Sequence, residues 1–283
     1  MDICTVALGI RAGYLLDTFA PVQGESTLYR LLIQLQQTTT AFDDVRIVYS
    51  KKAQQYFFIN INLLKRLLAT LDRDASTTQD SSNTNTKFVL LTEHVQIIPP
   101  PHEVITAAKH IAEATTATSS SSNSKEPLTI PLPEDLSTSS LIALAGFLLE
   151  YPVVYVPPSP SHDRDYDLER DHDHDQDQYQ TTSLNGVPLD LYQYTLVRNS
   201  NSNSNIKSRP KEQETHNTHT HTLLKFSSIA SLSTTNPSLK PEHMIKSLDL
   251  LFRDRLSGVG IGIGIETGIG SSGGISKSRI LWS

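Results

Sequence analysis

The stretch Leu141-Ile-Ala-Leu-Ala-Gly-Phe-Leu-Leu-Glu-Tyr-Pro-Val-Val-Tyr-Val156 is the longest apolar run of the chain, and polar, low-complexity sequence flanks it on both sides. Residues 141–149 are apolar around the whole helical circumference, which is typical of a helix that is buried on most of its faces. Ser137, Thr138 and Ser139 precede it as N-cap candidates. We therefore expect a buried helix to begin at this point of the chain.

The second half of the same run has the pattern of a strand. Pro152 cannot donate a backbone hydrogen bond inside a helix and favours extended geometry at Tyr151, so the helix is predicted to end near Glu150. The segment Val153-Val-Tyr-Val156 is β-branched and aromatic, as strands commonly are. A buried helix that leads directly into a buried strand requires a sheet for the strand to join and further helices that cover it.

Hydrophobic periodicity predicts elements of both kinds in the rest of the chain. Helices are expected at 2–9, 26–37, 63–72, 102–114 and 241–257, and strands at 12–17, 45–49, 55–61, 87–91, 189–197 and 223–227. Asn62 is the N-cap candidate for the helix at 63–72. Interleaved helices and strands favour an α/β or α+β fold, with a mixed β-sheet covered by helices.

Long tracts of Ser, Thr, Asn, Asp and His interrupt these elements. Such tracts bury too little apolar area to offset the entropy lost on ordering, so we expect them to be disordered inserts. The sequence thus predicts a single domain over residues 1–257 and a flexible tail rich in Gly, Ser and Ile at 258–283. The expected inserts lie at about 73–86, 115–130, 158–185 and 199–221.

Composition and charge exclude several classes of function. The net charge is −6, and no cluster of Lys and Arg stands out, so nucleic acid is not an expected partner. The apolar run is too short to span a bilayer and contains Glu150 and Pro152, so no membrane association is expected. Cys4 is the single cysteine, which excludes an internal disulfide and favours a reducing compartment. We expect a soluble protein of the cytoplasm or nucleus.

Three short segments resemble an uncharacterised eukaryotic family, that of human chromosome 1 open reading frame 74. The segment Leu149-Glu-Tyr-Pro-Val-Val-Tyr155 is similar to the family's Leu-Gly-Tyr-Pro-Val-x-Tyr, with Glu150 in place of the glycine. Leu15-Leu-Asp17 resembles the end of an early strand in the family, and Phe226-Ser227 resembles part of its late Phe-Ser-x-Pro segment. The resemblance supports the predicted domain and implies no activity.

Asp17 is the candidate catalytic residue. It stands where the first strand is expected to end, and ligands of α/β proteins bind at the carboxyl ends of strands. Aspartate at such a position also commonly caps a turn, and this is the interpretation we favour, because no His, Lys or second carboxylate can be placed beside it from sequence.

Tyr151 and Tyr155 are the candidate ligand-binding residues. Residues four apart in extended chain share one face, so both rings are expected on the same side of the strand. They either line a pocket or pack half-buried with their hydroxyls at the rim, and packing is the commoner outcome.

His172 and His174 are the metal-ligand candidates, in a segment of alternating Asp and His. A specific metal site needs fixed geometry and supporting hydrogen bonds, which a repetitive insert does not supply, so no metal and no other cofactor is predicted.

The chain contains no recognisable catalytic motif, so the sequence favours a protein without enzymatic activity that acts through contacts with an unidentified protein partner. The alternative is an enzyme that binds a small molecule near Asp17.

Overall fold

The long apolar run forms helix α5 (Thr138–Leu148) followed by strand β7 (Val153–Val156), as its sequence predicts. Ser137 is the N-cap of α5, and its side chain accepts a hydrogen bond from the backbone N–H of Ser140. These elements belong to a computed structural model that describes residues 2–17, 24–76, 86–92, 95–114, 129–158, 184, 187–198, 219–259 and 276–280.

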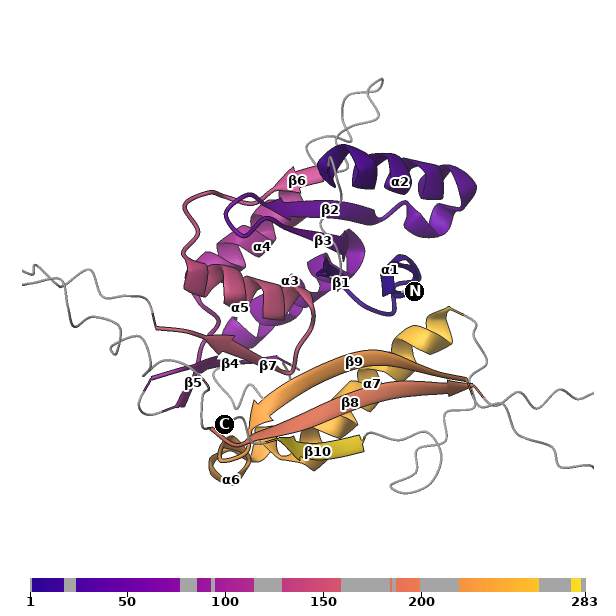
Figure 1. The fold of residues 1–283 in the computed structure, drawn as a ribbon. Coiled ribbons are helices and arrows are strands. Elements are labelled where there is room, and N and C mark those ends of the chain that lie inside the picture. The colour runs from indigo at the N-terminus through magenta and orange to yellow at the C-terminus, as the bar shows by residue number, and fades with distance from the viewer. Residues whose placement is uncertain are drawn as a thin grey trace, which may run out of the picture.

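The other helices and strands alternate along the chain, which gives an α+β fold and confirms the predicted fold class (Figure 1). The remaining helices are α1 (Asp2–Ala7), α2 (Gly24–Thr38), α3 (Ile61–Ser76), α4 (His102–Ala114), α6 (Leu232–Thr235) and α7 (Pro241–Gly258), with 3-10 turns at η1 (Thr40–Phe42) and η4 (Pro237–Leu239). The remaining strands are β1 (Gly13–Leu16), β2 (Val45–Ser50), β3 (Gln55–Asn60), β4 (Lys87–Leu90), β5 (Gln96–Ile98), β6 (Thr129–Pro131), β8 (Leu189–Arg198), β9 (His219–Ile229) and β10 (Ser276–Ile280).

The strands that the structure describes form three sheets rather than the single sheet expected. The first sheet has the order β1-β3-β2-β6 and the second the order β5-β4-β7, and each combines antiparallel and parallel pairs. The third sheet, β10-β8-β9, is antiparallel throughout. Residues 276–280, which the sequence assigned to the tail, pair with β8 as β10.

Helices and sheets alternate in layers (Figure 1). Helices α3, α4 and α5 pack between the first and second sheets, in one core that includes Phe57, Leu64, Ile111, Phe147 and Val154. Helices α1 and α2 pack on the other face of the first sheet. The other face of the second sheet packs with β8, β9 and α7. Helix α5 and strand β7 therefore lie where the layers meet.

The corner between α5 and β7 has an unusual backbone. The N–H of Glu150 donates to the carbonyl of Phe147, and the N–H of Tyr151 donates to that of Gly146, both at 3.0 Å, which is the Schellman arrangement. Glu150 has φ 59°, the left-handed region that this arrangement requires and that glycine usually supplies. A non-glycine residue there costs about 1–2 kcal/mol, so other contacts of Glu150 must offset that cost.

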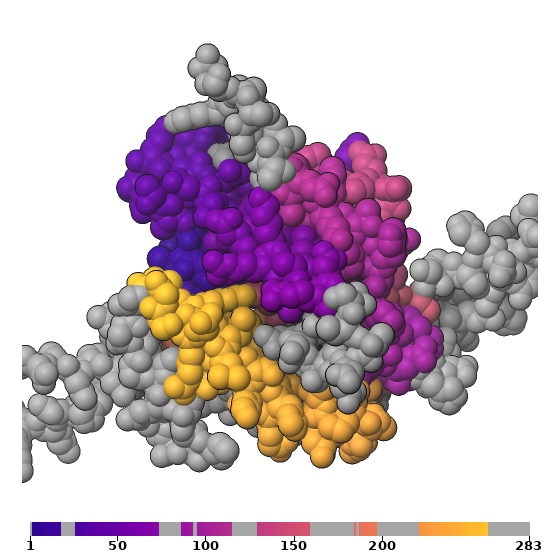
Figure 2. Space-filling model, turned by 180° about the vertical axis from the view of Figure 1, so that it is seen from behind, coloured from indigo at the N-terminus to yellow at the C-terminus, as the bar shows by residue number. Residues whose placement is uncertain are grey.

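Those contacts are a buried ion pair and a backbone hydrogen bond. The Glu150 carboxylate binds Arg255 of α7 through two bonds of 2.6 and 2.8 Å, and its Oε2 also accepts from the Ala12 N–H at 2.6 Å. Arg255 donates in addition to the carbonyl of Ile10 at 2.9 Å. The two charged side chains are only 4% and 8% exposed. The pair thus joins α7 to the N-terminal part of the chain, and Figure 2 shows the end of α7 against that part.

The segment that leads into β1 fits tightly against the same corner. A Cβ atom on Gly13 would lie 2.5 Å from the carbonyl oxygen of Leu148, so a side chain cannot be accommodated at this position. The close approach allows the Ala12 N–H to reach Glu150. Residues from the beginning, middle and end of the chain therefore meet at one point.

We predict that Arg255→Met lowers the free energy of unfolding by roughly 3–5 kcal/mol, because it leaves the Glu150 carboxylate buried without its partner. In a Glu150→Gly background the same substitution should cost much less, since the buried carboxylate is already absent and glycine accepts the left-handed backbone. Urea unfolding of the wild type, the two single variants and the double variant measures both effects.

Arg253→Met is the matched control. Arg253 lies on the same helix and pairs with Asp249 at 2.7 Å, but its side chain is 37% exposed, so its loss should cost less than about 1 kcal/mol. Equal costs for the two arginine variants would contradict a special role for the buried pair.

Candidate functional site

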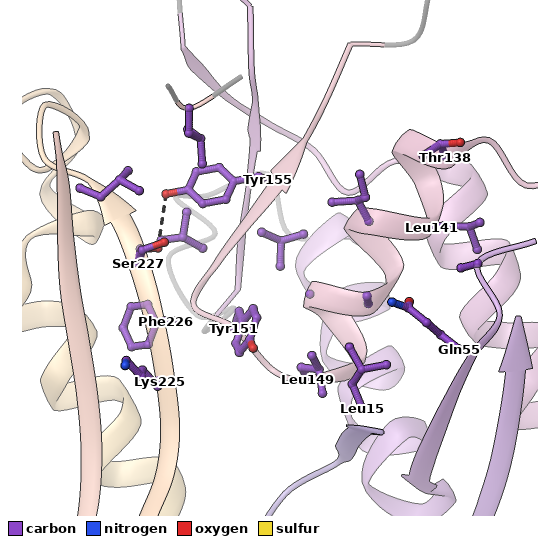
Figure 3. Close-up of a pocket in the computed structure, with 18 of the residues that line it drawn as sticks. Leu15, Gln55, Thr138, Leu141, Leu149, Tyr151, Tyr155, Lys225, Phe226 and Ser227 are labelled. Atoms are coloured by element: carbon purple, nitrogen blue, oxygen red, sulfur yellow. Dashed lines mark hydrogen bonds between the residues drawn. The ribbon is translucent and has the colours of Figure 1, made fainter. Parts of the chain in front are cut away.

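A cavity of about 970 Å³ opens beside the α5–β7 corner (Figure 3). Its walls come from α5, from β7 and from the β8–β9 ribbon of the third sheet, with further residues from β1 and from the turn between β2 and β3. The cavity therefore lies where the second sheet, the third sheet and the helices between the first two sheets meet. Most of the residues that line it are apolar.

One face of α5 forms a wall of this cavity. Leu141, Ile142, Ala145 and Leu149 all line it, at the three- and four-residue spacing that places them on one side of the helix. The opposite side is buried in the core, where Phe147 is 2% exposed. Ile142 by contrast is 48% exposed, because it faces the cavity and not a protein neighbour. The helix is apolar on all sides because its two faces contact two different apolar environments.

The facing wall is built from edge strands. Strand β7 is at one edge of the second sheet and β9 is at one edge of the third. The Tyr155 hydroxyl of β7 donates to the Ser227 carbonyl of β9 at 3.3 Å, which ties the two edges together (Figure 3). This bond fixes the position of β9 beside the cavity.

Both tyrosine hydroxyls of the site are held in the neutral form. Burial raises the pKa of Tyr155 to about 12, although hydrogen bonds with Ile229 and Ser227 act in the opposite direction. Burial also raises the pKa of Tyr151, with a further contribution in the same direction from Asp17 and an opposing one from Arg11. At neutral pH these phenols can donate or accept hydrogen bonds but cannot serve as bases.

The charged residues that line the cavity are both basic. Lys52 comes from the β2–β3 turn, and its ammonium donates to the Leu136 carbonyl at 2.7 Å. Lys225 comes from β9 and is exposed. Among the residues that the structure describes, no Asp or Glu lines the cavity.

The structure separates the candidate residues that the sequence singled out. Tyr151 and Tyr155 both line the cavity, whereas Asp17 follows β1, is exposed and is not part of the lining. Asp17 does lie near enough to raise the pKa of Tyr151. His172 and His174 lie outside the described residues, and within the described ranges no group of three or more His, Cys, Asp or Glu side chains could hold a metal ion.

Ile142, Lys52 and Lys225 were not singled out from the sequence. One signal was available for Ile142, since a helix that is apolar on every face has more apolar surface than core packing alone requires. No such signal exists for the lysines, because the turn and the strand that carry them meet the cavity only through the tertiary fold.

The chain belongs to the family described as Domain of unknown function (DUF4504), whose model matches residues 1–233. The match includes the whole of α5, β7 and β9 but ends before α7, which carries Arg255. No curated protein and no solved structure matches the chain. None of the described helices is both long and apolar enough to cross a membrane.

The high pKa of Tyr155 predicts a pH-dependent stability. Because folding raises this pKa from 10.0 to about 12, the protonated phenol stabilises the fold fully below pH 10, and this contribution is lost as the pH rises toward 12. The loss should be about 1–2 kcal/mol of the free energy of unfolding, after allowance for partial exposure. Urea unfolding at a series of alkaline pH values measures it.

Tyr155→Phe removes the titrating group and the bond to Ser227 together. The difference in unfolding free energy between wild type and this variant should therefore be constant up to about pH 10 and shrink above it. A difference that stays constant up to pH 12 would show that Tyr155 is not buried as the structure has it.

Proposed function

We propose that this protein binds a small molecule with an apolar body in the cavity between α5, β7 and β9, and that it does so without catalysing a reaction. The observation that carries the proposal is the outward face of α5. There Leu141, Ile142 and Ala145 line an open cavity although the helix has already buried its other face in the core.

The size and place of the cavity support a small molecule as the occupant. A volume of about 970 Å³ lies within the usual range for ligand sites, and such sites commonly form where separate structural layers meet. The lining adds a few polar groups to a mostly apolar wall, in particular the hydroxyls of Tyr151 and Tyr155. This combination is typical of sites in which apolar contact provides affinity and a few polar groups fix orientation.

The chemistry of the lining favours binding over catalysis. A hydrolytic or acid–base site needs a nucleophile or a base with a suitable pKa, within reach of a group that activates or orients it. The two tyrosines have raised pKa values, and Asp17 lies outside the lining. An enzyme centred on Asp17 stays the alternative, and unchanged ligand binding by Asp17→Asn would remove its main support.

The more specific assignments made from the sequence also remain proposals. These are membership of the family of human chromosome 1 open reading frame 74, action through a protein partner, and a location in the cytoplasm or nucleus. A protein-contact role requires an exposed surface and no internal cavity, so occupancy of the cavity by a small molecule separates the two functions.

The test uses the uncharged apolar fluorophore N-phenyl-1-naphthylamine with the full-length protein. The fluorophore should bind with an increase in fluorescence, and Ile142→Glu should weaken binding at least about tenfold, because the bound probe would cover an unpaired carboxylate. Ile142 is 48% exposed, so the substitution is compatible with folding.

Leu31→Glu is the matched control. Leu31 is an apolar residue of α2 that is 43% exposed and does not line the cavity, so its replacement should leave probe binding unchanged. Absence of probe binding, or equal losses in the two glutamate variants, would contradict the proposed function.

A further inference from the structure

From the two lysines of the cavity we infer that its ligand carries an acidic head group, so that the ligand class is an amphipathic acid such as a medium- or long-chain carboxylate. This inference rests on the proposed function and specifies the ligand of the same site. The geometry behind it is the pairing of an apolar wall on α5 with Lys52 and Lys225 on two other elements of the lining.

Neither of these lysines has an acidic partner among the residues that the structure describes. Other lysines of the fold do: Lys51 pairs with Glu134 at 3.0 Å and Lys109 pairs with Asp72 at 3.1 Å. The only bond that the Lys52 ammonium makes within the described ranges is to the Leu136 carbonyl, which leaves two of its three N–H groups for a ligand.

The positive charge of the cavity is opposite to that of the whole protein. The chain has a net charge of −6, yet the described lining contains two basic and no acidic side chains. A ligand acid group placed beside either lysine would meet a positive charge near a wall of low polarity, where the attraction is stronger than in bulk water. A ligand amine would meet only repulsion.

Tyr151 can contribute a neutral hydrogen-bond donor to a ligand in the same cavity. Its hydroxyl makes no hydrogen bond to any residue within the described ranges, whereas the Tyr155 hydroxyl is committed to Ser227. Because burial raises the pKa of Tyr151, its phenol stays protonated at neutral pH and can donate to a carboxylate. Figure 3 shows both tyrosines between β9 and α5.

The experiment compares decanoate with 1-decanol, which has the same chain length and no charge, by displacement of N-phenyl-1-naphthylamine. In the double variant Lys52→Gln/Lys225→Gln, decanoate should bind about tenfold more weakly than in wild type, while 1-decanol and the fluorophore bind unchanged. Both lysines are exposed, so the variant should fold like the wild type.

Lys51→Gln is the control variant. Lys51 precedes Lys52 in the same turn but pairs with Glu134 and does not line the cavity, so decanoate affinity should not change. Increasing the salt concentration should weaken decanoate binding in wild type and have little effect in the double variant.

The outcomes separate this inference from the proposed function. If the fluorophore binds but the double variant and wild type bind decanoate equally, the acidic head group is wrong and the apolar site stands. An equal loss in Lys51→Gln would also overturn it, because surface charge in general would then explain the effect. If neither the fluorophore nor either ten-carbon compound binds, the proposed function itself is wrong.

Discussion

The fold depends on how the chain turns from α5 into β7 at Glu150. Its left-handed backbone ends the helix, and its carboxylate holds Arg255 and the Ala12 N–H in a buried cluster. Glycine would adopt this left-handed backbone with less strain, but it has no side chain to make the buried contacts. Glutamate adopts the same backbone conformation, and its carboxylate also binds Arg255 of α7 and the Ala12 N–H of the segment before β1. Since α7 packs against the β8–β9 ribbon, this corner also determines where the wall of the cavity formed by β8 and β9 lies.

The cavity is a consequence of the same arrangement. Helix α5 packs one face against α4 and β7, and its outward face lines the cavity. The second and third sheets share a hydrophobic core, and the hydrogen bond from Tyr155 to Ser227 joins their edge strands beside the cavity. The cavity opens where this contact region adjoins the outward face of α5, and most of the residues around it are apolar.

Local sequence patterns were sufficient to predict many of the helices and strands. The bounds of α4 and β7 match those predicted, and Ser137 caps α5 as expected. Asn62 was wrong as the cap of α3: Asn60 accepts from the Leu63 N–H at 3.1 Å, because β3 leads into the helix without a loop. Strands β5 and β6 have three residues each, too few for a recognisable period, and the division into three sheets depends on pairings between distant segments. The tyrosines of the site could be named from sequence, whereas Lys52 and Lys225 could not.

Methyl NMR of the full-length protein, titrated with N-phenyl-1-naphthylamine, tests the central proposal most directly. That proposal is that one face of α5 packs in the core and the other face lines a binding cavity. The methyl signals of Leu141 and Ile142 should shift on addition of the probe, and that of Leu31 on α2 should not, because only the first two line the cavity. Unchanged signals from Leu141 and Ile142, or equal shifts at Leu31, would contradict it.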